Sequence, residues 1–164
     1  MWRQLRSILA RVRSGRETSV RAPSPGRNTR IRMVALVSND CDRQLLARMA
    51  PENGWVVHFP GSCVEAWHLL KQEKPPILLF DRDFPGTQWR EVIQEMSSGP
   101  DLVYSVLLSR VADDYLWNEV IRHGGYDVLA TPLKETEVLR AVRLGWSYLS
   151  SSTRLPSLLP KGGL

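Results

Sequence analysis

Residues 77–86 read ILLFDRDFPG, and this stretch decides the fold class. Its first four residues form a short, unbroken apolar run, which is typical of a strand buried on both faces of a parallel sheet. Asp81 and Asp83 follow the run, and Pro85 and Gly86 then mark a turn. In open α/β folds the residues that follow a strand lie at the edge of the sheet where ligands bind. The stretch therefore predicts a buried strand that ends in acidic side chains.

The same pattern recurs on both sides of this stretch. The further predicted strands are 33–37, 55–59, 103–108 and 126–130. Apolar residues at helical spacing and capping residues predict helices from Asp40 to near Pro51, from Ser62 to before Pro75, over 89–96, from Asp113 or Asp114 to Gly124, and over 134–150. Alternating strands and helices favour an α/β fold, a doubly wound five-stranded parallel sheet with helices on both faces.

Polar residues follow three of the other predicted strands at the same edge. Ser38, Asn39 and Asp40 come after the first strand, Ser109 follows the fourth strand, and Thr131 follows the fifth. Because the carboxyl ends of parallel strands meet at one edge, we expect these side chains to lie near Asp81.

These segments, in this order, resemble the receiver domain of response regulators in two-component signalling. The matching segments are ILLFDRDFPG, VLLSR at 106–110 and GGYDVLATPL at 124–133, and the resemblance covers residues 33–150. It implies a flavodoxin-like sheet with strand order 2-1-3-4-5. It also implies a bacterial, cytoplasmic signalling module and phosphoprotein rather than an enzyme.

The resemblance implies a role for each matching residue. Asp81 matches the aspartate that accepts a phosphoryl group, since a carboxylate can act as a nucleophile. Ser109 matches the hydroxyl that contacts the phosphoryl oxygen, and Tyr126 matches the aromatic residue that reports the switch. Thr131 stands where the family has a lysine, so a positive charge is missing there. We expect Arg110 to lie near Asp81 and to replace part of that charge.

The magnesium site that the resemblance implies is weakened. The family usually places acidic Mg²⁺ ligands just after the first strand, where this chain has Ser38 and Asn39. Asp40 and Asp81 remain as candidate carboxylate ligands, and Asp83 matches the position whose backbone carbonyl helps to hold the ion. Because Mg²⁺ prefers hard, charged oxygen ligands, the loss of two carboxylates lowers the affinity that we expect for the ion.

Two functions are consistent with this site. In the first, the chain is a stand-alone receiver that accepts a phosphoryl group on Asp81 from a histidine kinase. It then signals to a downstream protein through the helix–strand–helix face over 113–149. In the second, it is a pseudo-receiver that docks a partner on that face without phosphorylation. The same face is where we expect a homodimer to form.

Positive charge is concentrated in the first 32 residues. This segment holds one acidic residue and nine arginines, a net charge of +8: Arg3, Arg6, Arg11, Arg13, Arg16, Arg21, Arg27, Arg30 and Arg32. The rest of the chain has a net charge of −3. The predicted domain is therefore not expected to bind nucleic acid, despite the high isoelectric point of the chain.

The basic arm, residues 1–32, divides into two parts. Apolar residues recur at helical spacing in the first part: Trp2, Leu5, Ile8, Leu9 and Val12. The second part, 14–28, is rich in Ser, Gly, Pro and Arg and reads as a linker. The arm is thus either disordered or a short amphipathic helix that touches a membrane or a nucleic acid, unless translation starts at Met33. We expect 151–164 to be a flexible tail.

Overall fold

The computed structural model describes residues 30–152. The predictions for the amphipathic segment, the linker and nearly all of the tail fall on 1–29 and 153–164, outside the described residues. Five parallel strands form one sheet in the order β2-β1-β3-β4-β5, which confirms the predicted topology. The strands are β1 (Ile31–Leu36), β2 (Trp55–His58), β3 (Ile77–Asp81), β4 (Tyr104–Ser109) and β5 (Asp127–Ala130).

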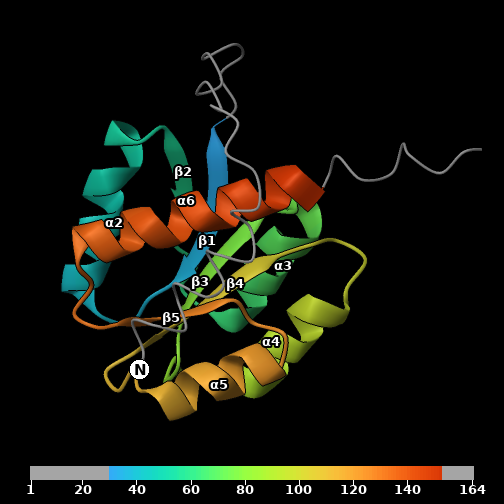
Figure 1. Ribbon diagram of the computed structural model, residues 1–164. Helices are drawn as coiled ribbons and strands as arrows, with labels where there is room; N and C mark the ends of the chain where they lie inside the picture. The colour runs from blue at the N-terminus through green and yellow to red at the C-terminus, as the bar shows by residue number, and fades with distance from the viewer. Residues whose placement is uncertain (1–29, 153–164) are drawn as a thin grey trace, which may run out of the picture.

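Five helices cover the two faces of this sheet (Figure 1). They are α2 (Asp40–Glu52), α3 (Cys63–Glu73), α4 (Trp89–Ser98), α5 (Asp114–Arg122) and α6 (Glu135–Ser152). Helices α2 and α6 pack on one face, and α3, α4 and α5 pack on the other. Helix α6 extends into the predicted tail as far as Ser152. No helix within the described part of the chain has the length and apolar composition needed to cross a membrane.

The central strands are buried on both faces, as their unbroken apolar runs predict. Leu78 and Phe80 of β3 face α3, α4 and α5, whereas Ile77 and Leu79 face α2 and α6. All four side chains have no exposed surface. Each fully buried large aliphatic side chain contributes about 1.5–3 kcal/mol, so the two clusters hold the helices against the sheet.

The predicted start of β1 and the predicted cap of α2 need correction. Strand β1 begins at Ile31 rather than residue 33, because Ile31 continues the ladder with β2 opposite Trp55. Asn39, and not Asp40, caps α2, and its side-chain oxygen accepts a hydrogen bond of 2.8 Å from the Cys41 N–H. The helix ends at Glu52, near Pro51 as predicted, and the side chain of its C-cap Asn53 donates to the Met49 carbonyl at 2.9 Å.

Gly145 lets α6 pass closely over an aromatic ring of β4, and we expect a methyl group there to be destabilising. A Cβ atom would lie 2.6 Å from Cδ1 of Tyr104, whose ring is stacked on Tyr126 and has little room to move. The Gly145→Ala variant should lose about 1–3 kcal/mol of unfolding free energy, although alanine favours helices. Urea denaturation would measure the loss. Ser147→Ala, exposed on the same helix, should change stability little, and equal effects would contradict this account.

Candidate functional site

Asp81 lies at the carboxyl edge of the sheet, as predicted. It is the last residue of the central strand β3 and is partly exposed. One of its carboxylate oxygens, Oδ2, accepts a hydrogen bond of 2.7 Å from the backbone N–H of Ser38. Ser38 follows the neighbouring strand β1, so the parallel pairing of β1 and β3 brings the two residues together. The structure therefore provides a partly exposed carboxylate with a fixed orientation.

Asp83 and Arg110 form an exposed pair beside Asp81. Their side chains lie 4.0 Å apart and are 72% and 87% exposed. Arg110 comes directly after β4, and its one ion pair within residues 30–152 is with Asp83 rather than with Asp81. An exposed pair at this distance contributes little to stability. The structure thus pairs Arg110 with Asp83, two residues from Asp81, and shows no ion pair between Arg110 and Asp81 within residues 30–152.

Ser109 and Thr131 lie side by side at the ends of β4 and β5. The backbone N–H of Thr131 donates to the Ser109 carbonyl at 3.0 Å. The buried Ser109 hydroxyl donates to the Val111 carbonyl at 2.8 Å and accepts from the Val111 N–H at 3.2 Å. The sheet thus places Ser109 at the expected edge, but its hydroxyl hydrogen bonds with the loop after β4.

The predicted metal ligands do not form a metal-binding group. No cluster of three or more histidine, cysteine, aspartate or glutamate side chains that could hold an ion occurs within residues 30–152. Asp40 is exposed in the first turn of α2, and Asp83 is paired with Arg110. Octahedral Mg²⁺ needs several hard oxygen ligands around one point. Mg²⁺ commonly keeps several water ligands, so Asp81 and the backbone carbonyl of Asp83 are the donors here that would hold the ion, with lower affinity than a site rich in carboxylates.

The arrangement of strands and helices matches solved structures of signalling domains. A signal receiver domain from Vibrio parahaemolyticus has a TM-score of 0.70 at 13% identity, covering 78% of this chain and 98% of that one. The chain has the receiver-domain fold. A response regulator from Thermotoga maritima has a TM-score of 0.64 at 19% identity, covering 72% of this chain and 98% of that one.

A third receiver-fold structure holds a modified aspartate. It is a response regulator from Burkholderia pseudomallei with a phosphorylated aspartic acid, a calcium ion and citrate. Its TM-score is 0.59 at 19% identity, and the match covers 78% of this chain and 75% of that one. No protein-family model and no curated protein matches the present sequence.

Tyr126, which the resemblance gives as the aromatic residue that reports the switch, lies away from the carboxyl edge of this receiver fold. It precedes β5 at the opposite end of the strand, where its N–H donates to the Ser105 carbonyl at 3.0 Å. Its ring stacks on Tyr104, with centroids 4.6 Å apart, and packs against Tyr148 at 5.1 Å. Burial and a hydrogen bond with Tyr148 raise the pKa of Tyr126 to about 12. Tyr126 therefore belongs to the packing of α6 on the sheet.

Asp42 is a structural residue near the site that the sequence interpretation missed. Its side chain is 2% exposed, and Oδ1 accepts a hydrogen bond of 2.7 Å from the backbone N–H of Leu133. Oδ2 is buried without a hydrogen-bond partner among the described residues. Leu46 and Met49 follow Asp42 at helical spacing and are also buried. The sequence could have predicted this contact, because a carboxylate on the apolar face of a helix is expected to be buried and hydrogen-bonded.

Proposed function

We propose that this chain is a receiver module in phosphorelay signalling, with a histidine kinase as donor and Asp81 as the phosphoryl acceptor. One observation carries the proposal: Asp81 ends the central strand with a partly exposed carboxylate that the Ser38 N–H orients. In the transfer step, a carboxylate oxygen of Asp81 attacks the phosphorus of a phosphohistidine. The new O–P bond gives an acyl phosphate, the N–P bond breaks, and the departing imidazole takes up a proton.

The α5–β5–α6 face is the proposed site of output to a downstream protein. Exposed apolar side chains lie on it or next to it: Val111, Tyr115, Ile121 and Leu144. Tyr115 is 69% exposed, and exposed aromatic side chains commonly anchor a protein partner. We propose this face for both the downstream partner and a homodimer.

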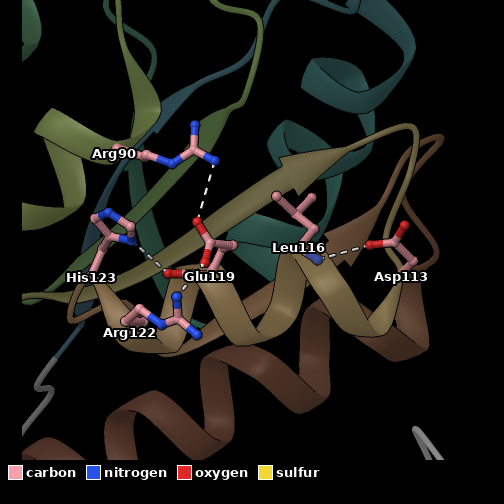
Figure 2. Close-up of polar contacts among 6 residues, drawn as sticks. All are labelled: Arg90, Asp113, Leu116, Glu119, Arg122 and His123. Atoms are coloured by element: carbon pink, nitrogen blue, oxygen red, sulfur yellow. Dashed lines mark hydrogen bonds and ion pairs between the residues drawn. The ribbon is translucent and has the colours of Figure 1, made fainter.

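Polar contacts fix α5 at its start and against α4 (Figure 2). Asp113 caps the helix by accepting a hydrogen bond of 2.8 Å from the Leu116 N–H. Glu119 lies between two arginines, with Arg90 of α4 at 3.3 Å and Arg122 at 3.2 Å. Because Glu119 connects α5 to α4, a structural change at the carboxyl edge of the sheet that moves α5 would have to alter these ion pairs. We propose that this connection couples the edge to the output face.

A second candidate function is docking of a partner on the same face without phosphorylation. Two observations favour it: the Ser109 hydroxyl hydrogen bonds with Val111, and residues 30–152 contain no cluster of three or more histidine, cysteine, aspartate or glutamate side chains that could hold a cation. In this candidate Asp81 is a structural acceptor for the Ser38 N–H.

Phosphoryl labelling separates the two candidates. We expect the full chain, incubated with acetyl phosphate and Mg²⁺, to gain the mass of one phosphoryl group. The Asp81→Asn variant should gain none because amide nitrogen and oxygen do not form the acyl phosphate. Asp83→Asn, which changes an exposed carboxylate two residues away, is the matched control and should still be labelled. No labelling of the unmodified chain, under conditions that label an ordinary receiver, would reject the phosphoryl-acceptor proposal in favour of docking.

A further inference from the structure

A groove lies between α3 and α4, on the face of the sheet opposite α2 and α6. It has a volume of about 130 Å³ and begins beside Gly86, in the loop that leads from Asp81 into α4. Apolar side chains form much of its lining, among them Trp67, Leu70 and Val92. Trp67 and Leu70 are only partly buried, so the groove leaves apolar surface in contact with water.

One wall of the groove carries uncompensated negative charge. Glu91 and Glu95 line it one helical turn apart on α4, and both are exposed. Within residues 30–152 neither glutamate has an ion-pair partner, whereas Arg90 beside them pairs with Glu119. An occupant of this groove therefore needs apolar side chains together with positive charge.

The first residues of this same chain have that chemistry. Apolar residues at helical spacing in 2–13 alternate with four arginines: Arg3, Arg6, Arg11 and Arg13. Trp2 and Leu5 belong to the apolar positions. An amphipathic segment of this kind suits a hydrophobic groove that has a charged rim.

The connecting chain is long enough for this contact. The sixteen residues 14–29 join the segment to the start of the described domain, next to β1. Extended chain spans up to about 3.3 Å per residue, or about 50 Å here, whereas the radius of gyration of a domain this size is about 14 Å. A tethered segment also has a millimolar effective concentration, so even a weak contact is populated.

We propose that residues 2–13 dock in the groove between α3 and α4, with apolar side chains toward Trp67 and Leu70 and arginines toward Glu91 and Glu95. The contact is intramolecular, and it does not depend on whether Asp81 accepts a phosphoryl group. Because the groove reaches the loop that follows Asp81, the docked segment lies close to the candidate site.

The two cysteines of the chain provide a test with an internal control. Cys63 lines the groove, and Cys41 is exposed on α2, which packs on the other face. The rate of maleimide modification of each thiol would be measured in the full chain by peptide mass spectrometry. We expect the Leu5→Asp, Ile8→Asp double variant to raise the modification rate at Cys63 roughly two- to tenfold. This is the protection that a docked segment gives when its effective concentration is about one to ten times the Kd of the contact. The rate at Cys41 should not change.

Charge exchange and a matched control complete the test. Glu91→Lys with Glu95→Lys should also expose Cys63, and adding Arg3→Glu with Arg6→Glu should restore its protection. Ser14→Asp with Ser19→Asp adds two acids outside the apolar stripe and should have no effect. A ratio of Cys63 to Cys41 rates that is the same in the Leu5→Asp, Ile8→Asp variant and the unmodified chain would overturn the proposal. So would release of Cys63 on dilution, which would show that the segment comes from a second copy.

Discussion

Replacement of both Ser38 and Asn39 by aspartate is expected to raise the rate of Asp81 phosphorylation by acetyl phosphate at least about tenfold in Mg²⁺. The two substitutions add carboxylates beside Asp81, whose Oδ2 already accepts the Ser38 N–H at 2.7 Å. Carboxylate oxygens are the ligands that Mg²⁺ prefers, and ligand charge strongly affects the affinity for a divalent cation. The backbone should tolerate the change, because Ser38 is exposed and aspartate caps a helix as well as asparagine.

The measurement is the initial rate of mass gain over a range of Mg²⁺ concentrations. Ser38→Asn, with Asn39 unchanged, is the matched control: it increases the size of the side chain but adds no charge. We expect it to leave the rate and the Mg²⁺ dependence as they are in the unmodified chain. If the double aspartate variant were phosphorylated at the same rate as the unmodified chain, the missing metal ligands would not limit phosphorylation at Asp81.

The Asp42→Ala variant is expected to lose about 1–3 kcal/mol of unfolding free energy, because it leaves the buried N–H of Leu133 without its acceptor. Asp42→Asn should lose less, since it keeps an oxygen for that N–H and removes a buried charge. Asp40→Ala changes an exposed acid in the same turn and should alter stability by no more than about 0.5 kcal/mol.

Urea denaturation of the three variants at neutral pH would rank these losses. Equal midpoints for Asp42→Ala and Asp40→Ala would show that the hydrogen bond to Leu133 contributes nothing to stability. A loss for Asp42→Asn as large as that for Asp42→Ala would show that the charge, rather than the acceptor oxygen, is what the fold requires.

The fold could be predicted because short stretches of neighbouring residues determine its strands and helices. The run of four apolar residues before Asp81 is buried as predicted, since a central parallel strand has no solvated face. Strand endings also placed Asp81, Ser109 and Thr131 at one edge, because parallel strands share their direction. Helix boundaries were less certain: Asn39 rather than Asp40 caps α2, and either side chain has a suitable acceptor.

The details of the site depend on contacts between distant residues, and these left no local pattern. The pairing of Arg110 with Asp83 depends on how two loops approach each other in space. The position of Tyr126 required the register of β5, which begins one residue later. The rings of Tyr104 and Tyr148, each 22 residues from Tyr126 in sequence, pack against its ring at the amino end of β5.

The contact between Asp42 and Leu133 joins residues 91 positions apart and has a consequence for synthesis of the chain. The ribosome makes α2 long before β5 and α6. The nascent α2 therefore lacks its contacts with Leu133 and α6 until synthesis of the domain is complete. Val138 and Val142 of α6 belong to the same buried cluster as Leu46 and Met49. A nascent chain that ends before α6 therefore exposes apolar surface on this side of the sheet, and a domain interrupted there is a substrate for chaperones and proteases.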